Sequence, residues 1–313
     1  MHDFGPEPDP LHIAPPSLRQ RYVFDCGLHR SGTTLITRYL AEHPMVSGFK
    51  NTGAIEDEGQ FLQTVLPVEN AFGGVGRFGF DPRAHMTEDS ALNTPAVEAK
   101  LKSEWRRYWD ESKPILIEKT PSNLLRMRLF QELFQPSYFI IVTRHPVAAS
   151  LAATKWTEGN LFSLLHHWVH CYRVARADAE RIDRKLWISY EAFVAEPLGQ
   201  LERISRFLGL APYSGWHPQL RNQNADYFRL WRTQYFGDTD RSMEQQPPER
   251  PRNVLTRLRE RLARDARESS LPLHRRRENR RNFYDALDAV ALLESAIAGF
   301  GYSFTDLDKI PPA

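Results

Sequence analysis

Cysteine and long apolar runs are both scarce in this sequence. Cys26 and Cys171 are the only two cysteines among 313 residues, too few for a disulfide framework, so we expect both to fill the core of a protein from a reducing compartment. No apolar stretch approaches the roughly 20 residues that a transmembrane helix needs. Residues 1–20 are rich in proline and acidic groups and lack a signal-peptide pattern. The composition therefore predicts a cytoplasmic protein with a flexible N-terminal arm.

The net charge is also small, with a formal value of +2 at pH 7. Such a balance gives no reason to expect a nucleic-acid partner, and no cysteine and histidine spacing typical of a zinc site occurs. We therefore expect no nucleic acid, no membrane and no metal. Positive charge is concentrated between Arg241 and Arg281, where 13 arginines stand against six acidic residues. We interpret this segment as a solubilising surface, with a contribution to an anionic ligand site as the alternative.

Short runs of β-branched and aromatic residues alternate with helical patterns. The runs predict strands at 21–27, 45–50, 114–118, 137–143 and 185–189. Helical periodicity lies between them, most clearly at 33–43 and 123–134. This alternation predicts an α/β fold, a P-loop-like three-layer sandwich whose central parallel sheet is flanked by helices.

The chain divides into a core and an extension in this interpretation. Residues 21–215 form the expected core, and residues 216–313 form a basic, helical C-terminal extension. The end of that extension, 283–304, predicts a helix that docks onto the core and stops near Gly299. Ligands of such sheets bind beyond the carboxyl ends of the strands, so the polar residues found there are the candidate site.

A phosphate-binding pattern follows the first predicted strand. Gly27 and Gly32 stand at the G-x-x-x-x-G spacing, directly before a predicted helix. We expect the backbone N–H groups of Ser31, Gly32, Thr33 and Thr34 to face an anion, where the helix dipole favours negative charge. Thr33, however, occupies the position at which a nucleotide triphosphatase carries its lysine.

The missing lysine limits the chemistry of this loop. A kinase neutralises a triphosphate with that lysine and with Mg²⁺ held by an aspartate at a strand end, and the sequence offers neither. A transferred group with less charge needs only arginine, lysine and backbone amides. Sulfuryl transfer fits, because its transferred group approaches neutral SO₃, whereas a phosphoryl group approaches anionic metaphosphate.

Four stretches resemble a known family when they are taken together. They are "GLHRSGTTLI", "EKTPSN", "TRHPVAAS" and "LWISYEAFVAEPLGQLERISRFLGL". In this order and spacing they resemble the sulfotransferases that use 3′-phosphoadenosine 5′-phosphosulfate and release adenosine 3′,5′-bisphosphate. The first stretch resembles the protein-tyrosine sulfotransferases and their bacterial relatives more than the animal cytosolic enzymes. The resemblance covers roughly residues 20–210.

This resemblance implies a role for each matching residue. The 5′-phosphosulfate would lie on Arg30 and the Ser31–Thr34 segment, and Arg30 would also stabilise the charge that appears as the bridging oxygen leaves. Lys119 in "EKTP" matches a lysine that faces the same leaving group. Arg144 matches the arginine that binds the 3′-phosphate, and Tyr190 matches a tyrosine that contacts adenine.

The second ligand of the 3′-phosphate departs from the family pattern. Many relatives carry a serine eight residues after the arginine, where this chain has Ala152. Ser150, two residues earlier, is the candidate in its place, and Lys155 is a further candidate.

A general base must also take the proton of the acceptor hydroxyl. In the tyrosine-type relatives a glutamate shortly after the second strand does so, and the matching stretch here offers Glu58 first and Glu56 second. We expect a helix to begin near Glu58, and both Glu58 and Lys119 to lie in an open cleft. His85 is the histidine alternative, whereas His29 is expected to be structural.

The sequence thus predicts a metal-independent sulfotransferase acting on a hydroxyl of a small molecule, glycan or peptide. A P-loop small-molecule kinase and a non-catalytic nucleotide-binding protein remain the alternatives. Oligomeric state is not indicated. The glycine-rich loop at 72–85 is either a lid or a plain connection. Several aromatic residues are either acceptor contacts or core, namely Phe72, Phe78, Phe80, Trp105 and Trp109.

Overall fold

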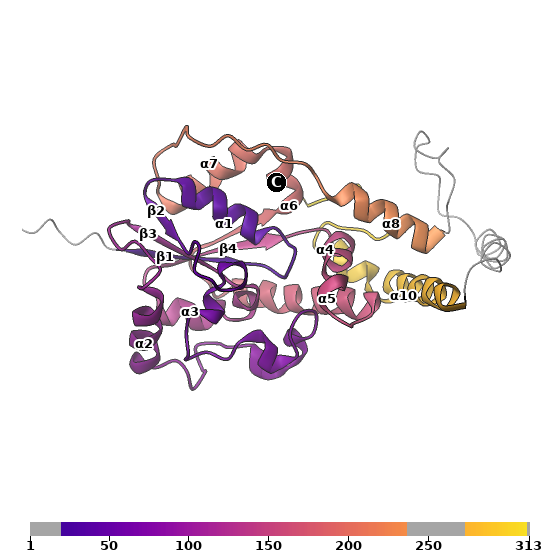
Figure 1. The fold of residues 1–313 in the computed structure, drawn as a ribbon, viewed down its shortest axis with the longest axis horizontal. Helices are drawn as coiled ribbons and strands as arrows, with labels where there is room; N and C mark the ends of the chain where they lie inside the picture. Colours follow the sequence, from indigo (N-terminus) through magenta and orange to yellow (C-terminus); the bar gives the residue numbers. More distant parts are fainter. Residues whose placement is uncertain (1–19, 237–272, 312–313) are drawn as a thin grey trace, which may run out of the picture.

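Five parallel strands form the centre of the protein. The computed structural model describes residues 20–236 and 273–311, and its sheet has the strand order β2-β3-β1-β4-β5 (Figure 1). The predicted arm, apart from its last residue, and most of the arginine-rich segment lie outside the described residues. The strands are β1 (Arg21–Cys26), β2 (Val46–Gly48), β3 (Ile115–Lys119), β4 (Ser137–Thr143) and β5 (Lys185–Ser189). All five predicted strands are confirmed.

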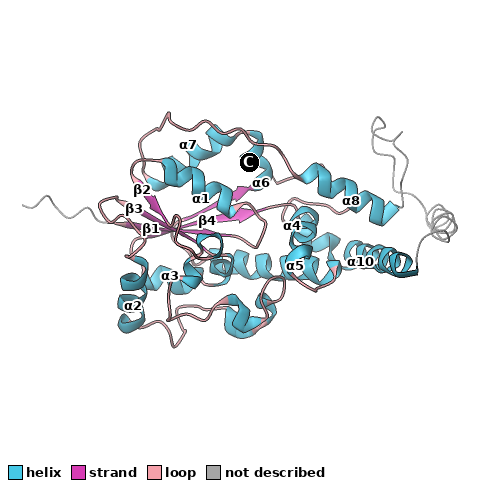
Figure 2. Cartoon of the chain, viewed as in Figure 1, coloured by secondary structure: helices cyan, strands magenta, loops and turns pink. Residues whose placement is uncertain are grey.

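Helices cover both faces of the sheet and make the predicted three layers (Figure 2). One face carries α1 (Thr33–Glu42), α6 (Tyr190–Ala195) and α7 (Pro197–Leu208). The opposite face carries α2 (Pro95–Trp105), α3 (Met127–Leu133) and α5 (Leu161–Ala179), and α4 (Pro146–Ala153) follows β4. None of the helices in the described ranges is long and apolar enough to cross a membrane.

The two faces of the sheet bury different kinds of side chain. Alternate residues of a strand point to opposite faces, so Val23 packs among aliphatic residues near α1, and Phe24 packs among aromatic ones. Phe24 lies against Phe130 and Phe139, with ring centroids 4.6 and 5.5 Å away. Cys26 and Cys171 are both buried and unpaired, as expected for core residues.

The C-terminal extension shares the core of the sheet domain. It contains α8 (Asn224–Phe236) and α10 (Leu273–Ala298), and α10 packs against α5 and ends next to Gly299, as predicted. Beyond α10, Phe300 and Tyr302 are buried against Trp168. The segment after α10 therefore returns to the sheet and lies near the ends of its strands.

Two local predictions need correction. The continuous helix expected over 123–134 is a 3₁₀ turn, Pro121–Leu125, followed by the short α3, because Arg126 adopts φ −127° between them. The helix expected to begin near Glu58 is absent from the described residues, since Glu58 links two 3₁₀ turns, Ile55–Asp57 and Gly59–Phe61.

The glycine-rich loop over 72–85 is largely packed. Its 3₁₀ turns bury Phe72 and Phe78, and Phe78 contacts the His167 ring on α5 with centroids 4.9 Å apart. Phe80 remains 39% exposed. Trp105 and Trp109 are buried, so four of the five candidate aromatic residues belong to the core.

Candidate functional site

The loop between β1 and α1 is shaped by two glycines. A Cβ atom at Gly27 would lie 2.5 Å from the Ser31 hydroxyl and 2.7 Å from the Val142 carbonyl, too close for any side chain. Gly32 has φ +107°, a left-handed conformation that glycine adopts freely, and a Cβ there would lie 2.9 Å from the Tyr190 ring. The backbone therefore needs glycine at both positions.

Three backbone amides at the start of α1 lack intrahelical partners. The first helical hydrogen bonds are donated by Leu35 and Ile36 to the Gly32 carbonyl, so the N–H groups of Gly32, Thr33 and Thr34 precede them. The Ser31 amide instead donates to the Leu28 carbonyl at 3.0 Å. Three N–H groups, and not the expected four, are therefore available to face an anion. Ser31 can offer only its hydroxyl, which is buried.

Arg30 lies beside these amides in a constrained conformation. Its φ is +67°, and its guanidinium stacks 5.1 Å from the centroid of the Trp156 ring. Its Nε atom is buried and has no hydrogen-bond partner within the described ranges. A buried N–H without a partner is costly, so an acceptor placed here would be stabilised.

Arg144 follows β4 and joins the loop. It is buried, its Nη1 donates to the Arg30 carbonyl at 2.9 Å, and its guanidinium lies 4.2 Å from the centroid of the Tyr190 ring. Burial lowers the pKa of Arg144 below its usual value, because the charged form is desolvated. Its buried Nη2 has no partner among the described residues.

Helix α8 supports Arg144, which the sequence did not indicate. Asn224, the first residue of α8, accepts the Arg144 Nε–H at 2.8 Å and donates to Glu191 at 2.6 Å. Glu191 also accepts from the Tyr302 hydroxyl at 3.0 Å. Two parts of the C-terminal extension thus hold Arg144 in place. No motif marks Asn224, and only its position at a helix start distinguishes it.

Lys119 and Glu58 lie side by side, but they are buried and not in the open cleft that the sequence predicted. The Lys119 ammonium lies 3.2 Å from the Glu58 carboxylate, and both side chains are almost completely buried. Lys119 also donates to the Glu56 carbonyl at 3.0 Å. The Glu56 side chain is exposed, and φ +52° at this residue turns its carbonyl toward Lys119.

A hydrogen-bonded chain connects Glu58 to the phosphate-binding loop. Gln60 donates to Glu58 at 2.7 Å and accepts from the Glu69 backbone at 3.0 Å. The Glu69 carboxylate lies 2.9 Å from the His29 ring. His29 is thereby held as part of the loop's framework, consistent with the structural role expected for it.

The remaining candidates lie in different surroundings. Ser150 is buried on α4, and Lys155 is exposed after that helix. His85 pairs with Asp178 at 2.8 Å near the end of α5. Tyr172 of α5 accepts the Leu28 N–H at the loop, and Asp178 lies six residues, roughly 9 Å, further along the helix. His85 therefore lies away from the phosphate-binding loop.

The arrangement provides cationic and N–H donors, with the Glu58 carboxylate beside Lys119, and it suits transfer of a group from an anionic donor molecule to a nucleophile that must lose a proton. In the described part of the chain, no group of three or more histidine, cysteine or acidic residues is arranged to hold a metal ion.

Comparison with known proteins points to one family. The model of the sulfotransferase family matches residues 23–215. Among solved structures, the sulfotransferase domain of the Synechococcus PCC 7002 olefin synthase is similar, with 20% identity, a TM-score of 0.43, and coverage of 81% of this chain and 96% of that one. A sulfotransferase of Alicyclobacillus acidocaldarius shares 17% identity with a TM-score of 0.40, over 70% of this chain and 90% of that one. No curated protein matches.

Proposed function

The chain belongs to the sulfotransferase family, and we propose that it moves the sulfuryl group of 3′-phosphoadenosine 5′-phosphosulfate to a hydroxyl of a small molecule, glycan or peptide. The cytoplasm is the proposed compartment, as the composition predicts.

One observation carries the choice of sulfuryl donor: two buried guanidinium N–H groups, Arg30 Nε and Arg144 Nη2, have no hydrogen-bond partner among the residues that the structure describes. They belong to residues joined by a 2.9 Å hydrogen bond, one at the free amides of α1 and the other at the end of β4. Two unsatisfied cationic groups so close together suit a ligand with two anionic groups, such as a nucleotide with a 5′-phosphosulfate and a 3′-phosphate. These unpaired guanidinium N–H groups therefore fit 3′-phosphoadenosine 5′-phosphosulfate as the sulfuryl donor.

Each residue is assigned a role in the proposed site. Arg30 and the amides of Gly32, Thr33 and Thr34 would hold the phosphosulfate, with the Ser31 hydroxyl beside them. Arg144 would hold the 3′-phosphate, with Ser150 as the second candidate ligand. Tyr190, which packs between Gly32 and Arg144, would border the adenine.

The reaction would proceed in line. The acceptor oxygen forms a bond to sulfur, its proton passes to a base, and the bond from sulfur to the bridging oxygen breaks to release adenosine 3′,5′-bisphosphate. Lys119 and Arg30 would stabilise the negative charge on the departing oxygen. Glu58 is the proposed base, because it adjoins Lys119, whereas the Glu56 carboxylate is exposed and His85 lies away from the loop.

Calorimetry with three nucleotides tests the choice of donor. We expect adenosine 3′,5′-bisphosphate to bind more tightly than 5′-AMP or ATP, because only this nucleotide places a phosphate on each arginine. Radiolabelled sulfate from the donor should then reach a generic phenol in excess EDTA. Equal affinity for ATP, or transfer that requires Mg²⁺, would support the kinase alternative instead.

A further inference from the structure

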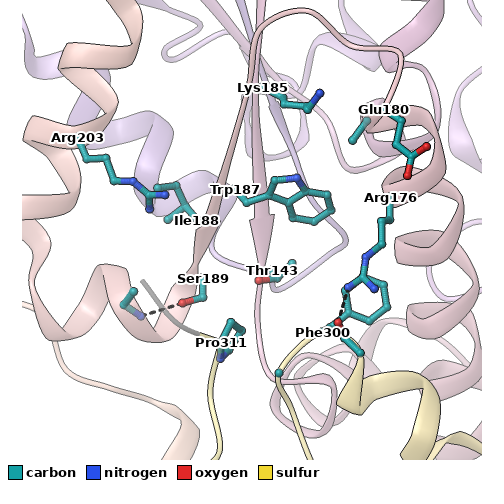
Figure 3. Close-up of a pocket in the computed structure, with 14 residues that line it drawn as sticks. Thr143, Arg176, Glu180, Lys185, Trp187, Ile188, Ser189, Arg203, Phe300 and Pro311 are labelled. Carbon is teal, nitrogen blue, oxygen red and sulfur yellow. Dashed lines mark hydrogen bonds between the residues drawn. The ribbon is translucent and has the colours of Figure 1, made fainter.

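A hollow lies over the free edge of β5, apart from the residues assigned to sulfuryl transfer. Its volume is about 530 Å³. Strand β5 is the last strand of the sheet and pairs only with β4 within the described ranges. Figure 3 shows the strand running along the hollow, with α7 on one side and α5 on the other. We call this hollow the β5 edge groove, lined by Lys185, Trp187, Ser189, Arg176, Glu180 and Arg203.

The backbone of β5 has hydrogen-bonding groups directed into this groove. Phe139 of β4 donates to the Arg184 carbonyl at 2.9 Å. Because successive residues of a strand direct their backbone groups to opposite edges, Leu186 and Ile188 also face β4. The backbone groups of Lys185 and Trp187 and the N–H of Ser189, whose carbonyl begins α6, therefore face outward, as at any unpaired edge that can accept another strand.

The charged side chains around the groove are mainly cationic. Arg203 enters from the α7 side, Arg176 from the α5 side, and Lys185 lies at the start of the strand, against the single acidic residue Glu180 (Figure 3). Arg176 is held by a 2.8 Å hydrogen bond to the Gly299 carbonyl and stacks on Phe300. Positive charge is therefore present on both faces of any strand added to this edge.

Trp187 adds an apolar surface to the α5 side of the groove. Its ring is half-buried and points toward α5, whereas the Ile188 side chain points to the opposite face (Figure 3). The five residues of β5 extend over roughly 13 Å at the usual rise of a strand. The groove thus accommodates a short extended segment whose side chains meet Arg203 on one face, and Arg176 together with the Trp187 ring on the other.

We propose that the β5 edge groove binds an acidic, extended peptide segment of a partner protein, which adds to β5 as a sixth strand. Its backbone pairs with the outward groups of Lys185, Trp187 and Ser189, and its acidic side chains pair with Arg203, Arg176 or Lys185. The free strand edge favours a peptide over a small anion, because a small anion would leave these backbone groups unused. This site does not depend on the proposed donor or acceptor.

Fluorescence anisotropy with labelled peptides tests the proposal on the full chain. The probe is fluorescein-labelled Glu-Val-Glu-Val-Glu amide, whose peptide has no hydroxyl side chain. No sulfuryl donor is added, and saturating adenosine 3′,5′-bisphosphate blocks the phosphate-binding loop. We expect saturable binding by this probe. Lys-Val-Lys-Val-Lys should not bind, and Glu-Pro-Glu-Pro-Glu should bind at least about tenfold more weakly, because proline lacks the N–H that strand pairing needs.

Charge reversal in α7 provides a matched pair of variants. Arg203→Glu should weaken binding of the acidic probe at least about tenfold, whereas Arg206→Glu, an exposed position on the same helix outside the groove, should change it less than about twofold. Equal binding of the proline peptide, or equal effects of the two variants, would overturn the proposal. Citrate displacing the probe at the same concentration as unlabelled peptide would indicate a small-anion site and overturn it as well.

Discussion

The ammonium of Lys119 lies 3.2 Å from the carboxylate of Glu58, although 61 positions separate the two residues in the chain. Both side chains are almost completely buried, so each charge depends on the other for compensation. The pair therefore contributes to folding as well as to the proposed chemistry, and variants at either position need a measurement of stability beside the measurement of activity.

Replacing Lys119 by methionine should separate these contributions. We expect turnover to fall much more than affinity for adenosine 3′,5′-bisphosphate, because the ammonium would act mainly on charge that develops in the transition state. We also expect a loss of about 3 kcal/mol in the free energy of unfolding, since Glu58 is left buried without its partner. The double variant with Glu58→Gln should recover part of that stability but no activity. Unchanged turnover in Lys119→Met would exclude Lys119 from the chemistry.

Glu58→Gln and Glu56→Gln form a matched pair for the general base. The first should lower turnover by about 10² or more while leaving affinity for the bisphosphate nearly unchanged, because a base contacts the acceptor. The second should resemble the unaltered protein, since Lys119 contacts only the backbone carbonyl of Glu56. Steady-state kinetics with a phenol acceptor, together with calorimetry, distinguish the two. Loss of turnover in His85→Ala with full activity in Glu58→Gln would reverse the assignment.

Asn224→Ala should weaken binding of the 3′-phosphate through Arg144. The lost hydrogen bond to a charged group corresponds to about 1.5 kcal/mol, or roughly tenfold in affinity. The effect should be larger for adenosine 3′,5′-bisphosphate than for 5′-AMP. Gln223→Ala is the control, because that side chain is exposed beside Asn224. A similar loss of affinity for both nucleotides would point to general disruption of the site.

Gly32→Ala and Gly53→Ala separate backbone strain from steric contact. Both glycines have positive φ, +107° and +84°, so alanine is strained at each. Only at Gly32 would the new Cβ meet another group, the Tyr190 ring at 2.9 Å. We expect Gly53→Ala to cost about 1 kcal/mol in stability and to keep nucleotide affinity. Gly32→Ala should reduce both, as measured by thermal unfolding and calorimetry. Equal affinities in the two variants would argue against close packing of Tyr190 on the loop.

Asp25 makes the stability depend on pH. Burial raises the pKa of Asp25 to about 8, although Thr37 donates a 2.7 Å hydrogen bond to it. Between about pH 4 and 8 the unfolded chain has lost this proton and the folded protein retains it, so the contribution of Asp25 to stability decreases as the pH rises. The free energy of unfolding should fall by up to about 1.4 kcal/mol per pH unit in this range.

Asp25→Asn should remove that contribution. Chemical denaturation across this pH range gives the free energy of unfolding of the variant and of the unaltered protein. The contributions of the other titrating groups cancel in the difference between the two values. The variant should gain stability relative to the unaltered protein as the pH rises. A constant difference would show that Asp25 does not change its protonation within this range.

The strands and the phosphate-binding loop were predictable because their signals are local. Each strand is a short run of β-branched or aromatic residues, and Gly27 and Gly32 stand at a spacing that the backbone itself requires. The break at Arg126 was not predictable, because leucines continue at helical spacing on both sides of it. Tertiary contacts there outweigh local preference: the Arg126 guanidinium donates to the Pro67 carbonyl at 2.7 Å.

Contacts between distant segments were also missed. The burial of Lys119 and Glu58 follows from the irregular segment around Glu56, whose conformation no periodic pattern describes. Trp156 contacts Arg30, and Asn224 contacts Arg144, from other parts of the chain. Neither residue belongs to a motif. Their contribution depends on how the segments pack, which a single sequence does not indicate.

The support that α8 provides to Arg144 bears on how this protein can be shortened. The recognisable family segment ends at residue 215, and a gene truncated there would encode every motif yet omit Asn224 and Tyr302. Glu191 would lose two of its hydrogen-bond donors, and Arg144 would lose an acceptor. The smallest working unit is therefore longer than the smallest recognisable one, and expression trials should retain the chain through the segment that follows α10.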